Sequence, residues 1–132
     1  MEGPNPVPDA PPPPPRDRRE RLLDAIGDPV ARQIVLMLND VPHSAQELLQ
    51  ANHIPQSTLY RRLHELQELG VVGIQRTAIT TDGKRVDLYR SLLEEFKVEL
   101  KGTRLDVTFK LRDLASERVR ELWSAVRKEA NR

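Results

Sequence analysis

Residues 44–90 constrain the fold of this chain more than any other stretch, because they contain two helical patterns and two strand patterns in a fixed order. The first helical pattern ends in a turn at residues 52–55, and the second ends at Gly70, a residue type that commonly terminates helices. Two β-rich runs follow on either side of Asp82-Gly83, a pair that favours a tight hairpin turn. The order helix, turn, helix, hairpin predicts a winged helix-turn-helix.

The composition agrees with a small domain of this kind. The 132 residues are 31% charged and 38% hydrophobic, which suits a small, helix-rich soluble domain. Together with the two strand runs, this predicts an α+β fold that is mostly α. The chain has no cysteine, which excludes disulfide scaffolds, zinc fingers and thiol sensing. No apolar run approaches the ~20 residues of a membrane helix, so we expect a cytoplasmic protein without a membrane partner. The net charge of +1 decides nothing about nucleic acid.

Proline dominates the start of the chain. Residues 1–15 contain eight of the eleven prolines, which predicts a solvated polyproline-II tail, with a ligand for a proline-binding domain as the alternative. Residues 16–21 are basic and lead into a first helix over residues 16–26 that Gly27 ends. The basic run is either a solvated helical turn or an arm that contacts phosphates.

Two further helices have clear starting signals. Asp28 precedes Pro29, the arrangement of an N-cap followed by a first helical residue, and apolar residues then recur at helical spacing up to Leu38. Ser44 and Glu47 have the spacing of a capping box, in which each side chain bonds an amide at the helix start. These signals predict helices that begin at residues 29 and 45.

The next helix has one apolar side and one polar side. Leu59, Leu63 and Leu66 recur at i, i+4 and i+7, so they face the core. Hydrogen-bonding side chains near the start of such a helix suit the major groove, where Gln can bond adenine and Arg can bond guanine. The alternative is an ordinary solvated helix face. The outward residues are Gln56, Ser57, Tyr60, Arg61 and His64.

The hairpin that follows strengthens the interpretation of this stretch as a DNA-binding unit. Val71, Val72 and Ile74 begin it, and Val86 and Leu88 alternate in its second strand, so we expect this apolar side to close over the helices. Its cations suit contacts with phosphates or the minor groove. They are Arg76, Lys84 and Arg85.

The stretch from about residue 24 to residue 90 resembles the winged helix-turn-helix of ArsR-like transcription regulators, especially those of archaea. The matching motifs are DPVAR at 28–32, SAQEL at 44–48, STLYRRL at 57–63 and LQELGVV at 66–72. The resemblance covers roughly half of the chain. It implies a two-fold dimer that places Gln56, Ser57, Thr58, Tyr60 and Arg61 at successive major grooves.

The chain departs from this family in two respects. Family members often have Ser or Thr at the cap of the recognition helix, whereas this chain has Pro55 there. Metal sensing in the family uses Cys and His ligands, but His43, His53 and His64 lack the spacing of a metal site. We therefore expect no metal and no cofactor.

Residues 91–132 are predicted to be a dimerisation unit. Period-two alternation on both sides of Gly102 favours a second hairpin, with a helix as the rival because Leu92, Phe96 and Leu100 also fit a spacing of four. Asp113 can cap a last amphipathic helix that reaches about Asn131. The predicted dimer interface consists of Phe96, Val98, Val107, Phe109, Val119, Leu122, Trp123 and Val126.

These patterns predict three regions: a tail (1–15), a winged helix-turn-helix (16–90) and a dimerisation unit (91–132). The predicted function is a sequence-specific regulator of transcription that binds double-stranded DNA as a homodimer. No glycine-rich phosphate loop, nucleophile elbow or metal motif occurs in the sequence, so we do not expect an enzyme. The rival functions are a protein-interaction module of a transcription assembly and a sensor of a small effector whose nature the sequence leaves open.

Overall fold

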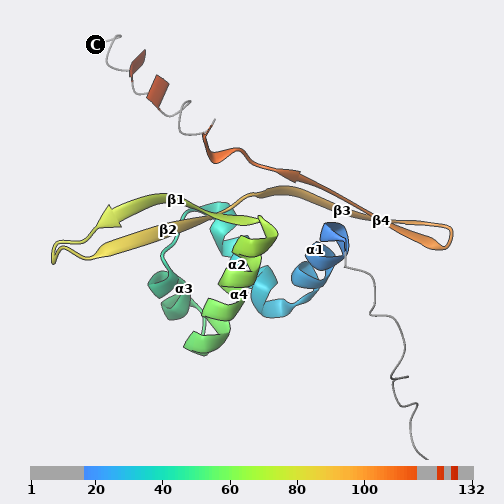
Figure 1. Cartoon of the computed structure of the whole chain (residues 1–132), viewed down its shortest axis with the longest axis horizontal. Coiled ribbons are helices and arrows are strands. Elements are labelled where there is room, and N and C mark those ends of the chain that lie inside the picture. Colours follow the sequence, from blue (N-terminus) through green and yellow to red (C-terminus); the bar gives the residue numbers. More distant parts are fainter. Residues whose placement is uncertain (1–16, 116–121, 124–125, 128–132) are drawn as a thin grey trace, which may run out of the picture.

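The computed structural model describes residues 17–115, 122–123 and 126–127. Four helices lie on one side of a long ribbon made of two antiparallel hairpins, β1–β2 and β3–β4 (Figure 1). This arrangement confirms the predicted α+β winged helix-turn-helix. The elements are α1 (Arg18–Gly27), α2 (Pro29–Asp40), α3 (Ala45–Ala51), α4 (Gln56–Leu69), β1 (Val72–Ile79), β2 (Arg85–Ser91), β3 (Leu93–Lys101) and β4 (Arg104–Leu111).

The helix starts follow the capping signals of the sequence. The Asp28 carboxylate accepts a hydrogen bond from the Ala31 amide at 2.8 Å, with Pro29 in the first turn of α2. Ser44 and Glu47 form both bonds of the predicted capping box at the start of α3. Both predicted starts are therefore confirmed. The first helix begins at Arg18, two residues later than predicted, because Asp17 caps it.

The core between the helices is aliphatic. The predicted inward residues Leu59, Leu63 and Leu66 of α4 are buried, and they pack with leucines and an isoleucine from α1, α2 and α3. Phe96 and Phe109 pack at the edge of this cluster. Fully burying one such aliphatic side chain stabilises a fold by roughly 1.5–3 kcal/mol, so this cluster determines how α4 is held.

The C-terminal end of α4 is attached to two other elements. Gly70 has a φ of 82°, the left-handed conformation that favours glycine, and the Val71 amide bonds the Leu66 carbonyl at 3.1 Å. From α1, Arg18 Nε donates a hydrogen bond to the Leu69 carbonyl at 3.1 Å, and its guanidinium lies 5.3 Å from the centre of the Phe109 ring. Arg18 therefore joins α1, the end of α4 and β4.

The first hairpin forms the predicted wing, with its turn at Asp82-Gly83. An isolated β-bridge between His43 and Tyr89 joins the loop before α3 to the base of the wing, with amide–carbonyl distances of 3.1 and 2.8 Å. Val71 and Val72 are buried in the core, as predicted, and Tyr89 of β2 packs against it. Ile74 is exposed, whereas Val86 and Leu88 are half-buried and lie outside the core cluster. The apolar side of the wing therefore closes over the helices only at its base.

Residues 93–111 form a hairpin rather than the rival helix, as predicted. The strands pair Phe96 with Phe109 and Val98 with Val107, and Gly102 lies in the turn with a φ of 61°. Only Leu92 separates β2 from β3; its amide bonds the Val71 carbonyl at 2.8 Å, and its carbonyl accepts from the Arg112 amide at 2.6 Å. The two hairpins are thus joined by one residue.

After β4, the Asp113 carboxylate accepts a hydrogen bond from the Ala115 amide at 3.0 Å, as expected of a helix cap. Most of the predicted last helix, including Val119, lies outside the described residues.

We predict that Arg18→Met lowers the free energy of unfolding by about 1 kcal/mol, because it removes a charged hydrogen bond to a helix-end carbonyl and the contact with Phe109. Urea unfolding measures this change. The matched control is Arg104→Met, because Arg104 forms a long, exposed pair with Asp106 at 3.9 Å and is expected to change stability by less than about 0.5 kcal/mol. Equal effects of the two substitutions would contradict the role of Arg18.

Candidate nucleic-acid interface

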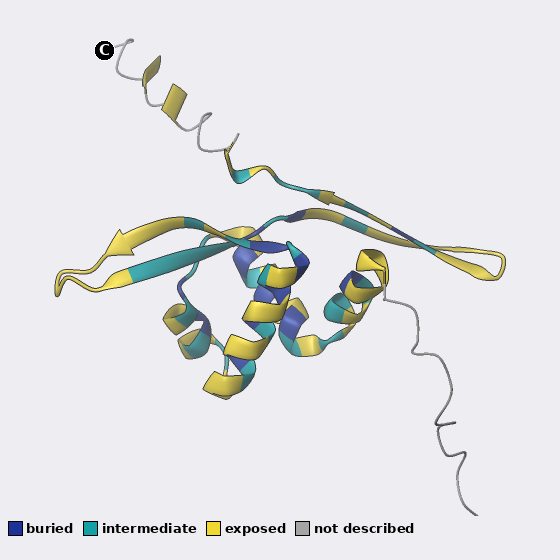
Figure 2. Cartoon of the chain, viewed as in Figure 1, coloured by how far each residue is buried: buried dark blue, intermediate teal, exposed yellow. Residues whose placement is uncertain are grey.

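The N-terminal turns of α4 are the most exposed part of the helix-turn-helix (Figure 2). Gln56, Ser57, Tyr60 and Arg61 are all exposed, whereas Thr58 is half-buried beside Leu59. Four of the predicted base-contacting side chains therefore lie together on one exposed surface. Thr58 is turned partly away from it. Within the described residues, neither a hydrogen bond nor an ion pair involves the Arg61 side chain.

The start of α4 has no side-chain cap. Pro55 occupies the N-cap position and makes no side-chain hydrogen bond to the first turn, as the sequence predicts. The first amides of a helix have no partner within the helix, and together with the helix dipole they attract anions. The uncapped start therefore leaves amides that a phosphate oxygen or a base acceptor can use.

Tyr89 lies at the base of the wing and is partly buried. The pKa of its hydroxyl is raised mainly by burial, and further by Asp87 and Tyr60.

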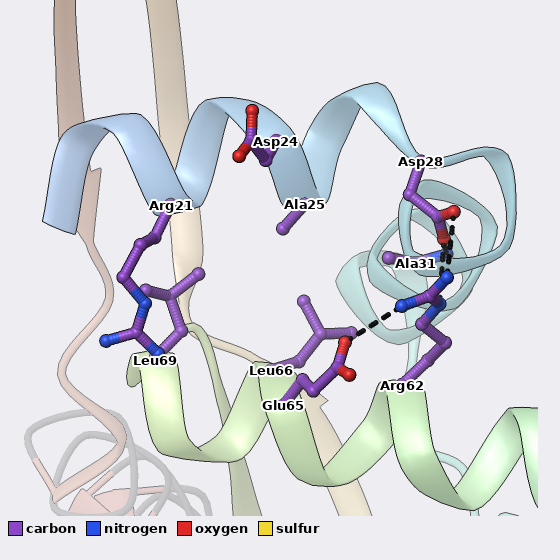
Figure 3. Close-up of a pocket in the computed structure, with 9 residues that line it drawn as sticks. All are labelled: Arg21, Asp24, Ala25, Asp28, Ala31, Arg62, Glu65, Leu66 and Leu69. Carbon is purple, nitrogen blue, oxygen red and sulfur yellow. Dashed lines mark hydrogen bonds and ion pairs between the residues drawn. The ribbon is translucent and has the colours of Figure 1, made fainter. Parts of the chain in front are cut away.

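Arg62 points away from this surface, although it follows Arg61 directly in the sequence. Its Nε lies 3.2 Å from Asp28 Oδ2, and its Nη1 lies 3.1 Å from Glu65 Oε2 (Figure 3). Asp28 is also the cap of α2, so Arg62 connects the middle of α4 to the start of α2. The three side chains line a cavity of about 240 Å³ between α1, α2 and α4. We did not predict this role of Arg62 from the sequence.

The predicted contact His64 is exposed but lies beside an acid. Its Nε2 is 3.1 Å from Glu68 Oε1, one helical turn further along α4. His43, predicted to be an ordinary turn histidine, lies 3.3 Å from Glu47, and the backbone amide of Ser44 and His43 together lower the pKa of that carboxyl. Among the described residues, no group of three His, Asp or Glu side chains is placed to hold a metal ion.

The predicted wing cations are exposed, and two of them lie near acids. Lys84 Nζ is 4.0 Å from Asp82 Oδ2, and Arg85 Nε is 3.7 Å from Asp87 Oδ1. Exposed pairs of this kind contribute at most about 1 kcal/mol, so a phosphate can replace the acid as partner at little cost. Arg76 lies within β1, so it is closer to the helices than the hairpin turn is.

The residues predicted for a dimer interface fall into two groups in the structure. Phe96 and Phe109 pack against the core of the same chain, and Val107 is buried. The second group is exposed on the surface of the chain, and it consists of Val98, Leu122, Trp123 and Val126.

The central part of this structure is similar to known helix-turn-helix domains. Residues 26–73 match the model of a helix-turn-helix domain family, and this match includes all of α2, α3 and α4. An ArsR-like transcriptional regulator from Rhodococcus sp. RHA1 is similar, with 16% sequence identity, a TM-score of 0.40, and 86% of this chain and 79% of that chain covered. The ferric uptake regulator of Vibrio cholerae is also similar, with 16% identity, a TM-score of 0.30, and 83% and 78% covered. No curated protein matches this chain.

Residues 26–73 are therefore similar to a helix-turn-helix domain. In the described part of the chain, no helix has both the length and the apolar character needed to cross a membrane.

We predict that Arg62→Met lowers the free energy of unfolding by about 1–2 kcal/mol, because it leaves the half-buried Asp28 carboxylate without its guanidinium partner. Arg61→Met is the control, since this exposed neighbour should change stability by less than about 0.5 kcal/mol. Chemical denaturation of both variants tests the assignment. It would be refuted if Arg61→Met were the more destabilising change.

Proposed function

We propose that this chain is a sequence-specific DNA-binding regulator of transcription, with α4 as the recognition helix. The main support is the exposed polar surface at the N-terminal turns of α4, which contains Gln56, Ser57, Tyr60 and Arg61. The helix-turn-helix match over residues 26–73 agrees with this function. The more specific assignment to ArsR-like regulators of archaea stays a prediction from the sequence motifs.

The proposed recognition uses hydrogen bonds to base edges. Arg61 has five guanidinium N–H donors, and it can bond O6 and N7 of guanine together. Gln56 can do the same with N6 and N7 of adenine. Both side chains lie in the first two turns of α4, the part of a recognition helix that enters the major groove.

The wing is proposed to contact the DNA backbone. Lys84 and Arg85 lie near the hairpin turn, and Arg76 lies on β1, so the three cations are spread along one hairpin. Contacts with phosphates position a protein on DNA without selecting a sequence, and they make binding salt-dependent. The acids beside Lys84 and Arg85 limit the attraction at long range.

We further propose that the regulator is a homodimer formed through the residues after β4. Leu122, Trp123 and Val126 are apolar and exposed in the single chain, a condition that association with a second copy would relieve. A two-fold dimer would present two recognition helices to a DNA site with two matching halves. Regulation then consists of binding at a promoter, with no chemical step.

An unbiased selection of DNA sequences, followed by affinity measurements over a range of salt concentrations, tests this function. A selected site whose binding weakens as salt rises is the expected outcome. Failure to enrich any sequence, together with binding that does not depend on salt, would reject the function and favour a protein-interaction module.

For the selected site, we predict that Arg61→Ala reduces discrimination between the site and its single-base variants by about 1–3 kcal/mol, the usual value of one side chain bonded to a base. Competition binding at constant salt measures this loss. The control is Lys97→Ala on the second hairpin, which should leave discrimination unchanged. Unaltered discrimination in Arg61→Ala would remove Arg61 from the recognition surface.

The expected result for Lys84→Ala is weaker binding to all DNA sequences alike, because a phosphate contact carries no sequence information. The slope of log K against log salt should become less steep by about 1. Titrations of the selected site and of an unrelated duplex, each at several salt concentrations, measure both effects. A loss restricted to the selected site would instead assign Lys84 to base recognition.

A further inference from the structure

The second hairpin has one fully apolar face, and its outer part extends past the helices. The register places the apolar residues of β3 opposite those of β4, on one side of the sheet. Toward the turn this face becomes exposed: Val107 is 8% exposed, Leu105 47% and Leu100 83%. The hairpin reaches beyond α1, and its outer part is exposed (Figures 1 and 2). The helices thus cover only the inner half of the apolar face.

A groove lies between α1 and this hairpin. It has a volume of about 350 Å³, and Leu105 and Val107 from β4 form one wall. The other wall, at α1, is mostly charged and consists of Asp17, Arg19, Glu20, Leu23 and Asp24. The exposed residues Leu100 and Val98 continue the β4 wall across the register pairs. The groove is therefore apolar on the hairpin side and open to solvent.

We propose that the proline-rich segment at residues 1–15 occupies this groove, with the five prolines at 11–15 against the hairpin. The position of the groove supports this occupant, because Asp17 lines the groove and lies two residues after the last of these prolines. Five residues of polyproline II span ~15 Å. The β4 wall from Val107 to the turn is about 10 Å long at ~3.3 Å per residue. The segment is thus long enough to cover the exposed wall.

The chemistry of proline suits this wall. Proline has no amide hydrogen, so a run of prolines can lie against leucine and valine side chains without burying an unsatisfied donor. Its carbonyls remain free to accept hydrogen bonds, and Arg19, with its exposed guanidinium, is at the same groove. A proline segment can therefore contact the apolar β4 wall on one side and accept hydrogen bonds from Arg19 on the other.

The size of the patch favours a tethered segment over a second copy of the chain. Val98, Leu100 and Leu105 are 42%, 83% and 47% exposed, so these three aliphatic side chains offer at most a few hundred Å². A stable dimer needs about 800 Å² from each partner. A segment attached to α1 loses little freedom on docking, because its effective concentration near the groove is high. A small surface is therefore sufficient for the tail but not for a dimer.

The first test compares the parent chain with a variant in which the five prolines at 11–15 are replaced by serine, using methyl NMR spectra. The resonances of Leu100 and Leu105 should shift in the variant, because proline rings no longer lie against them. Ile79 at the end of β1 is the internal reference, since it is 78% exposed and belongs to the other hairpin. Unchanged Leu100 and Leu105 resonances would overturn the proposal.

The second test is a double-mutant cycle on thermal stability. Leu105→Ser should lower Tm by about 4 °C in the parent chain, and by clearly less in the serine-tail variant, where the contact is already lost. Ile79→Ser serves as the matched control, with the same effect in both chains. Equal effects of Leu105→Ser in the two chains would refute docking of the tail.

Light scattering on the same proteins separates the tail from a second copy. The tail proposal predicts that Leu105→Ser leaves the molar mass in solution unchanged. If this substitution halves the molar mass while the serine tail does not, a second copy occupies the groove and the proposal is wrong. The proposal does not depend on DNA binding, so neither outcome bears on the function of α4.

Discussion

The hydrogen bond from Arg18 to the Leu69 carbonyl attaches the C-terminal end of α4 to α1, while the leucines of the core hold the rest of that helix. The last carbonyls of a helix have no partner within it and carry its partial negative charge. A guanidinium at this point therefore both donates a hydrogen bond to a free carbonyl and interacts favourably with the helix dipole. The same side chain lies over Phe109, which ties the helix end to the second hairpin. The exposed first turns of α4 are thus oriented in part by a contact at the opposite end of the helix.

The three parts of α4 differ in how they are held. The end is held by Gly70 and Arg18, and the middle is held by Arg62 and by leucines in the core. The start has only Pro55, whose side chain donates and accepts nothing. A helix held this way leaves its first turns open to an outside partner while its direction stays constant. Pro55 replaces the Ser or Thr cap that is common in the ArsR-like family, and this replacement is consistent with an open helix start.

Local signals predicted most of the fold, whereas contacts between distant residues were not predictable. The Asp28 cap, the Ser44–Glu47 box and the leucine spacing of α4 depend on neighbours within one or two turns, and each is present in the structure. Arg61 and Arg62 look alike in the sequence. Which one turns inward depends on Asp28, 34 residues away from Arg62. Similarly, the packing of Tyr89 against the core depends on where β2 crosses the helices, which alternation alone does not determine.

The single-residue joint at Leu92 limits where insertions and deletions can occur in related chains. Side chains alternate between faces along a strand, so one extra residue between Ser91 and Leu93 would turn the apolar face of the second hairpin outward. The turns at Gly83 and Gly102 carry no such constraint, because each lies at the outer end of its hairpin. Insertions and deletions are therefore tolerable in both turns, while the joint between the hairpins keeps its length.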